Sequence, residues 1–238
     1  KAYAKTDIGS KRSMNQDYMY CNTEPVGSFQ NLLIVADGMG GHRAGDYASR
    51  LCVETMVQSL EKSAHKTPVS LFEEAVTAAN KAVFEESASH VEYEGMGTTV
   101  VACTLEENTL YIANIGDSRL YLIRDGIEQI TDDHSLVEEM VKQCNITESE
   151  ARIHPQKNTI TRALGINEEV QADFFEIDVE QGDVIMLCSD GLSNMIEDED
   201  MEYIVKNSDT LQTAAESLVA RANENGGNDN ITVVLAEV

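Results

Sequence analysis

The sequence has no tryptophan, only three prolines and far fewer basic than acidic side chains. Against 42 Asp and Glu stand 17 Lys and Arg, so the formal net charge is −25. A broadly anionic surface argues against nucleic acid or an anionic membrane as a main partner, because both need clustered Lys and Arg. The ordinary interpretation of the excess is solubility. A more specific interpretation is that some of the excess acidic residues form a cation-binding site.

The sequence also lacks the marks of a disulfide-bonded or membrane-spanning protein. Its five cysteines, at positions 21, 52, 103, 144 and 188, are odd in number and far apart, which excludes a disulfide framework or a zinc ribbon. No apolar run approaches the ~18 residues of a membrane helix, and no signal-peptide pattern opens the chain. We therefore expect reduced thiols, a cytoplasmic location and no membrane insertion by this chain.

The pattern of apolar residues predicts an α+β protein. With no repeat or linker, residues 1–238 are expected to form a single catalytic domain. Apolar runs predict strands at 18–21, 31–36, 98–104, 109–114, 119–124, 171–177, 184–188 and 231–237. Helical periodicity predicts helices at about 44–60, 68–86, 135–142, 147–152, 201–206 and 210–224. Strands and helices do not alternate, which favours antiparallel sheets with helices on their faces. The polar segment 135–165 interrupts the strands and is predicted to form a flap subdomain.

Four aspartates share one kind of setting, beside a glycine or a turn residue at one end of an apolar run: Asp37, Asp117, Asp190 and Asp229. Any one of them, taken alone, indicates a turn. Taken together, they predict carboxylates at the ends of buried strands. If those ends converge, the carboxylates repel one another unless divalent cations bind between them. Oxygen ligands favour Mg²⁺ or Mn²⁺ over zinc.

A second motif, Arg12-Ser-Met-Asn-Gln-Asp17, lies near the start of the chain. The planar guanidinium of an arginine can grip a phosphate with two hydrogen bonds. Asp17 could orient a metal-bound water. By itself the hexapeptide is more typical of a solvated surface loop.

Eight ordered blocks carry a resemblance to a known family: RSMNQD, LLIVADGMGGHRAG, GMGTTVVAC, NIGDSRLYLIRDG, TDDHSLV, ITRALG, MLCSDGLSN and GGNDNITVVL. From about Thr6 to Val234 the chain resembles the type 2C metal-dependent serine/threonine protein phosphatases, in their compact bacterial branch. The resemblance implies a four-layer αββα sandwich, in which two antiparallel sheets pack face to face with helices outside. It also implies a binuclear metal site at one edge.

The resemblance assigns the metal ligands. It implies that Asp37 bridges two tightly bound Mn²⁺ or Mg²⁺ ions, that Gly38 gives its carbonyl oxygen to one of them, and that Asp190 and Asp229 bind the other. Asp117 would hold a third, weaker ion together with Asp190.

The resemblance also implies a mechanism. A hydroxide bridging the metals attacks phosphorus in line, without a phosphoenzyme, while Arg12 binds the phosphate and Asp17 hydrogen-bonds a metal-bound water. His42 is one candidate for protonating the leaving group, and a metal-bound water is another. Some relatives carry a histidine where this chain has Met39, so the general acid stays open. His134 and His154 are interpreted as structural.

The implied partners are phosphoprotein substrates and a cognate serine/threonine kinase, with a monomer as the expected state. A cysteine phosphatase is excluded, because no arginine lies six residues after any cysteine. Cys188 is interpreted as a buried strand thiol rather than a redox switch. The remaining alternative is a non-catalytic module of the same fold that binds phosphoproteins. Such a protein should have lost metal ligands, and this chain keeps them.

Overall fold

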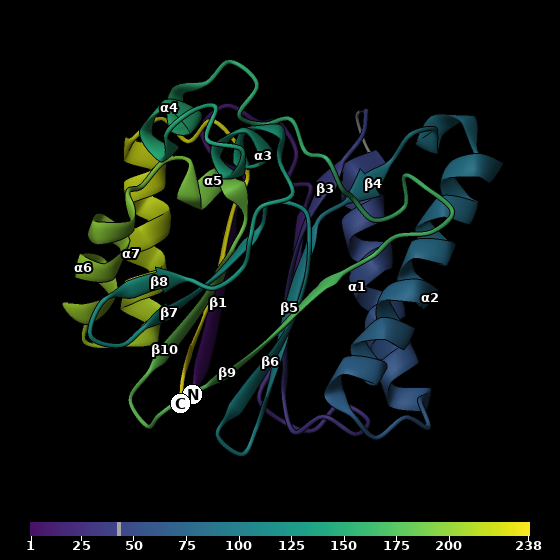
Figure 1. Ribbon diagram of the computed structural model, residues 1–238, viewed down its shortest axis with the longest axis horizontal. Helices are drawn as coiled ribbons and strands as arrows, with labels where there is room; N and C mark the ends of the chain where they lie inside the picture. The colour runs from purple at the N-terminus through teal and green to yellow at the C-terminus, as the bar shows by residue number, and fades with distance from the viewer. Residues whose placement is uncertain (42–43) are drawn as a thin grey trace.

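The computed structural model of the protein describes residues 1–41 and 44–238. It has four layers, with two β-sheets face to face in the middle and a pair of helices outside each sheet (Figure 1). Every strand pairing within the described residues is antiparallel. The predicted αββα sandwich is therefore confirmed.

The first sheet has the strand order β1 (Ala2–Asp7), β11 (Ile231–Glu237), β10 (Val184–Cys188), β7 (Arg119–Ile123) and β8 (Ile127–Gln129). The second has the order β2 (Asp17–Asn22), β3 (Leu32–Met39), β5 (Val100–Glu106), β6 (Thr109–Ile115) and β9 (Asp173–Asp178), and the short β4 (Gly97–Thr98) pairs with β3. Helices α1 (Ala44–Lys62) and α2 (Pro68–Ser89), followed by the short η1 (Val91–Tyr93), cover the second sheet. Helices α6 (Asp198–Lys206) and α7 (Leu211–Glu224) cover the first (Figure 1).

The two-residue period of the strands builds the layers of the core. Along β3, Leu33 and Val35 pack between the two sheets, whereas Ile34 and Ala36 point the other way, toward α1 and α2. A strand buried on both faces needs apolar residues at every position, which explains the unbroken run of apolar residues in β3. A third cluster fills the space between the first sheet and α6 and α7.

The segment 135–165 lies across one edge of the sandwich and carries α3 (Leu136–Lys142) and α4 (Glu148–Ile153) (Figure 1). Side-chain caps begin both helices. Ser135 accepts a hydrogen bond from the amide of Glu138 at 3.2 Å, and Thr147 forms a capping box with Glu150. The chain ends lie at the opposite edge, where the Lys1 amine donates to the carbonyl of Glu237 at 3.1 Å.

The structure differs from the sequence prediction in a few elements. Strand β1 was missed, because AYAKTD lies at a sheet edge, is only partly buried along its whole length and has no apolar run. The short β4, β8 and α5 (Asp190–Ser193) were also missed. Strand β3 continues to Met39, so Asp37 lies within a strand, and its predicted place at a strand end is wrong. No helix in the described residues is long and apolar enough to cross a membrane.

Candidate metal centre

The site begins where β2 and β3 pair, because Asp17 lies opposite Asp37 in that register. Asp17 is 5% exposed, and its Oδ2 accepts hydrogen bonds from Ser189 Oγ at 2.7 Å and Thr232 Oγ1 at 2.6 Å. Both hydroxyls come from the first sheet or its edge, so Asp17 joins the two sheets. Burial raises the pKa of Asp17 to about 7 in spite of these two bonds.

Asp37 is held through its backbone by Thr99. Its amide donates to Thr99 Oγ1 at 3.0 Å, and its carbonyl accepts from the amide of Thr99 at 2.9 Å. Burial raises the pKa of Asp37 well above its ordinary value. Four further carboxylates raise it as well: Asp17, Asp190, Asp117 and Asp229. The aspartates that the sequence singled out therefore lie near enough to Asp37 for their charges to act on it.

Gly38 lies against the first turn of α1 with no room for a side chain. A Cβ on Gly38 would lie 1.9 Å from the carbonyl oxygen of Gly45, and one on Gly45 would lie 2.7 Å from the carbonyl oxygen of Gly38. The two glycines thus allow the start of α1 to approach β3 closely. The carbonyl of Gly38, the predicted metal ligand, thus belongs to the residue after Asp37 in β3 and lies against the start of α1.

Asp190 is the first residue of α5, just after β10. Its Oδ2 accepts from Asn194 Nδ2 at 3.0 Å, and burial followed by the charge of Asp229 raises its pKa to about 6. Asp229 precedes β11, and its Oδ1 accepts from the amide of Asn230 at 2.8 Å. Both carboxylates are fixed by local hydrogen bonds, as a preformed site requires.

Arg12 lies at the solvent side of these carboxylates. Its Nη2 donates to Asp229 Oδ2 at 2.7 Å, while half of its side chain remains exposed. The hydrogen bond to Asp229 raises the pKa of the guanidinium, and the charges of Asp37 and Asp190 add to this effect. A cation in this position can receive an anion that arrives from solvent.

Asp117 lies in the turn that follows β6. Burial raises its pKa well above the ordinary value, and Asp190 and Asp133 raise it further. The preceding Gly116 has a φ of 103°, and a Cβ there would lie 2.6 Å from the Thr99 side chain. Glycine is therefore required before Asp117.

Several residues that shape the site were missed from the sequence. Buried Asn230 donates to the carbonyls of Ile8 and Met14, each at 2.9 Å, and accepts from the amide of Gln16 at 2.8 Å. It thereby fixes the loop that carries Arg12. Asn230 belongs to the GGNDN block on which the family resemblance rests, so the sequence did contain a signal for it. Its structural role could not be predicted, because it depends on contacts between chain segments more than 200 residues apart.

The histidines and the cysteine that the sequence analysis discussed lie in different parts of the structure. His42 lies outside the described residues. His154 follows α4, and its Nδ1 accepts from the amide of Gln156 at 3.2 Å. His134 is buried and contacts the turn that carries Asp117. Cys188 is a buried strand thiol, as interpreted, and burial raises its pKa to about 12.

The donor set fits hard divalent cations. Two buried carboxylate oxygens, Asp17 Oδ1 and Asp190 Oδ1, have no hydrogen-bond partner, and a lone buried anionic oxygen is costly unless a cation compensates it. No three His, Cys, Asp or Glu side chains of residues 1–41 and 44–238 already enclose a point for an ion. One oxygen each of Asp229 and Asp190 is instead bonded to Arg12 and Asn194.

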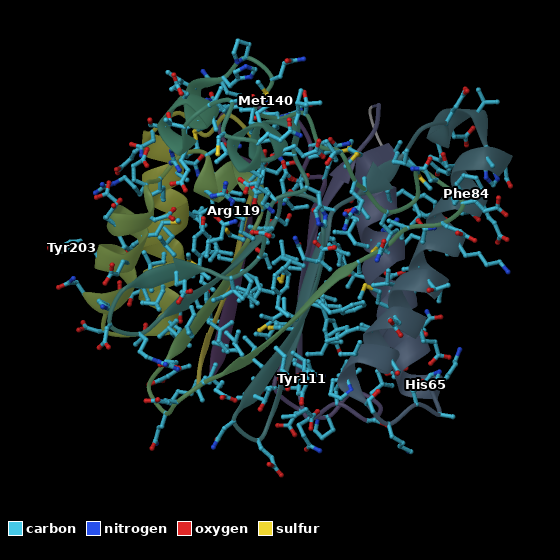
Figure 2. The ribbon with its side chains drawn as sticks, viewed as in Figure 1. His65, Phe84, Tyr111, Arg119, Met140 and Tyr203 are labelled. Atoms are coloured by element: carbon cyan, nitrogen blue, oxygen red, sulfur yellow. The ribbon has the colours of Figure 1, made fainter. Side chains whose placement is uncertain are left out.

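A cleft of about 560 Å³ opens beside Asp117 and Asp190, between the segment 135–165 and helices α5 and α6. Its walls are mostly charged and include Arg119, which Figure 2 shows below Met140 of α3. The cleft reaches Asp117 and Asp190 and is large enough for several side chains of a polypeptide.

Comparison with known proteins decides the family. The family model described as protein phosphatase 2C matches residues 9–236. The chain belongs to the protein phosphatase 2C family. It is 39% identical to the serine/threonine phosphatase stp of Listeria monocytogenes over 243 residues, covering 98% of this phosphatase and 94% of that protein. The predicted family and enzyme class, a serine/threonine phosphoprotein phosphatase, are thereby confirmed.

Solved structures of serine/threonine phosphatases have the same fold as this chain. The serine/threonine phosphatase PstP/Ppp of Mycobacterium tuberculosis superposes on the phosphatase with a TM-score of 0.91 at 36% identity, covering 100% of this chain and 98% of that one. A catalytic domain of PstP, solved in complex with two manganese ions, gives a TM-score of 0.88 at 34% identity, covering 100% and 97% of the two chains.

Proposed function

We propose that the phosphatase hydrolyses phosphoserine and phosphothreonine in proteins at a centre where Asp37, the Gly38 carbonyl, Asp190 and Asp229 hold two divalent cations. Asp117 and Asp190 would hold a third, weaker ion. One observation carries the assignment: aspartates from separate segments raise one another's pKa, and two of their buried oxygens lack partners. The manganese-bound neighbour supports Mn²⁺ as one cofactor, with Mg²⁺ as the other candidate.

When bound, the cations supply Lewis acidity, which activates the attacking water and offsets charge on the phosphoryl oxygens. Residues of the chain position the attacking water. Asp17, fixed by Ser189 and Thr232 through Oδ2, directs its unpartnered Oδ1 as a hydrogen-bond acceptor for the attacking water. This direct displacement needs no covalent phosphoenzyme.

Arg12 binds the substrate phosphate. Its guanidinium donates one hydrogen bond to Asp229 Oδ2, and its exposed side leaves further N–H groups that can donate to two phosphate oxygens. The leaving hydroxyl needs a proton, and His42 is the candidate donor carried by the chain. The cleft below the segment 135–165 receives the polypeptide around the phosphorylated residue, and in this proposal that segment acts as a flap of the single catalytic domain.

The proposal extends to the setting of the enzyme. Its substrates are phosphoproteins modified by a cognate serine/threonine kinase, and it acts as a monomer in the cytoplasm. The free state of all five cysteines supports a reducing compartment.

Hydrolysis of a phosphothreonine peptide tests the function. We expect phosphate release that requires Mn²⁺ or Mg²⁺, stops in EDTA, resists inhibitors of the okadaic-acid type and is lost in Asp37→Asn. The other candidate, a non-catalytic phosphoprotein-binding module, predicts binding of the peptide with no phosphate release at any metal concentration. Unchanged turnover in Asp37→Asn would reject the metal mechanism.

A further inference from the structure

The turn Gly116–Ser118, which carries Asp117, is held from two sides. On the side of Asp37, the hydroxyls of Thr99 and Ser118 are 2.7 Å apart in a buried hydrogen bond. Thr99 also forms two hydrogen bonds with the backbone of Asp37. This side links the turn to β3 and fixes its distance from the centre of the site.

On the other side, a single residue binds both backbone polar groups of Gly116. The amide of Gly116 donates to His134 Nδ1 at 2.9 Å, and the amide of His134 donates to the Gly116 carbonyl at 2.9 Å. His134 is only 7% exposed. A neutral imidazole that accepts at Nδ1 carries its hydrogen on Nε2. That hydrogen points to Asp173 Oδ2, 3.0 Å away.

Asp173 orients the ring and is itself held by Arg162, whose Nη1 donates to Asp173 Oδ1 at 2.6 Å. Burial alone would raise the pKa of Asp173, but the hydrogen bonds from His134 and Arg162 outweigh this and lower it. Asp173 is therefore a carboxylate that keeps accepting from the ring. With both nitrogens engaged, the imidazole is turned away from any role as acid or base in the reaction.

The same histidine lies where the two ends of the segment 135–165 meet. The amide of Thr161 donates to the His134 carbonyl at 2.8 Å, and the amide of Leu136 donates to the Thr159 carbonyl at 2.8 Å. A bridge between Ser135 and Ile160 continues this contact. Both ends of the segment are thus hydrogen-bonded at His134 or directly beside it.

We infer that His134 is a positioning residue, which holds the Gly116–Ser118 turn so that Asp117 faces Asp190 and ties this turn to both ends of the segment 135–165. The expected effect on catalysis rests on the proposed function, whereas the role of His134 in holding the Gly116–Ser118 turn does not depend on it. A group that orients a metal ligand through a hydrogen bond typically changes metal affinity or activity by about 10- to 100-fold when it is removed.

Two isosteric substitutions separate the contacts of the ring. His134→Asn keeps an acceptor near the place of Nδ1, whereas His134→Gln carries its amide to the place of Nε2 and loses that acceptor. Hydrogen exchange at the Gly116 amide in the metal-free protein reports the contact directly. Binding of Mn²⁺, and kcat and KM on a phosphothreonine peptide, report its consequence. His154→Ala is the matched control, because His154 Nδ1 also accepts a backbone amide but lies outside this network.

We expect His134→Asn to keep the Gly116 amide protected, and His134→Gln and His134→Ala to raise its exchange rate at least about tenfold. In the latter two, kcat should fall about 10- to 100-fold with KM within about twofold, while His154→Ala matches the wild type. Equal exchange rates of the Gly116 amide in His134→Asn and His134→Gln would overturn the inference. The comparison of these two variants is sufficient even if His134→Ala does not fold. If the wild type releases no phosphate, the proposed function fails, while the exchange ranking still decides the role of His134.

Discussion

Asp17 and Asp37 lie opposite each other in the antiparallel pair of β2 and β3. Asp17 is buried, Asp37 is partly buried, and further carboxylates raise the pKa of both. Like charges directly opposite in a sheet destabilise it, and burial adds to the cost. A protein keeps such a pair only where function needs it, so the arrangement links stability to the occupancy of the site.

Asp37→Asn should stabilise the metal-free protein while it destroys activity. Removing one of the coupled carboxylates relieves repulsion and desolvation, which we expect to raise the free energy of unfolding in EDTA by about 1 kcal/mol. Phosphopeptide hydrolysis with Mn²⁺ should fall at least about 100-fold. Urea denaturation and a phosphate-release assay measure the two effects. The control Asp209→Asn, at an exposed position, should change neither. A less stable metal-free Asp37→Asn would show that the carboxylates do not repel one another.

Stability of the metal-free protein should fall as pH rises from about 4 to about 7. The pKa of Asp17 is raised from 3.8 to about 7, so in this window the folded state holds a proton that the unfolded state has lost. The folded state therefore binds more protons, and the free energy of unfolding decreases with pH. Asp190, with a pKa of about 6, acts in the same direction.

Denaturation in EDTA from about pH 4 to about pH 7 measures this slope, and Asp17→Asn should make it shallower. Asp183→Asn is the control. Hydrogen bonds from Arg124 lower the pKa of Asp183 in the folded protein. Its contribution to the free energy of unfolding is therefore complete above the pKa of Asp183 in the unfolded chain, and it is lost only in more acidic solution. Equal slopes for Asp17→Asn and the wild type would contradict the assignment of a protonated, buried Asp17.

Arg12→Ala should weaken substrate binding more than turnover. The half-exposed guanidinium is placed to bind the phosphate, and losing one charge-assisted contact corresponds to a KM about tenfold higher. We expect kcat to remain within about threefold. Arg12→Lys should recover only part of the affinity, because an ammonium cannot form the paired hydrogen bonds. Lys11→Ala is the neighbouring control. A constant KM with a collapsed kcat would instead place Arg12 in the chemical step.

Gly38→Ala should distort the site through the backbone. The added methyl would lie 1.9 Å from the Gly45 carbonyl oxygen, so β3 and the start of α1 must separate. We expect a loss of about 1–3 kcal/mol in the free energy of unfolding and weaker Mn²⁺ binding. Gly126→Ala, where the methyl would meet no atom within 4 Å, should be neutral in both measurements. A variant Gly38→Ala with wild-type Mn²⁺ affinity would exclude the Gly38 carbonyl as a ligand.

The sequence predicted most of this architecture, because the information was local. Apolar runs located the central strands, and helical periodicity located α1, α2 and α7 within a few residues. The setting of four aspartates beside turn residues singled out the carboxylates that the fold gathers. Strand β1 escaped because an edge strand with partly buried residues leaves no strong pattern.

Contacts between distant segments could not be predicted. Nothing local in Thr99 indicates that it hydrogen-bonds both Asp37 and Ser118, and nothing local in His134 indicates its bond to Gly116. Asn230 organises a loop that lies 214 residues away in sequence, at Gln16. Such residues are recognisable only once the sheets have brought their segments together.

The central claim is that Asp37, the Gly38 carbonyl, Asp190 and Asp229 hold two cations. Anomalous diffraction at the manganese edge, from crystals grown with Mn²⁺, tests it most directly. We predict two strong anomalous peaks among these four residues, both absent from crystals of Asp37→Asn. Crystals in which these oxygens have no anomalous peak beside them, with Mn²⁺ bound elsewhere or not at all, would contradict the proposed metal centre.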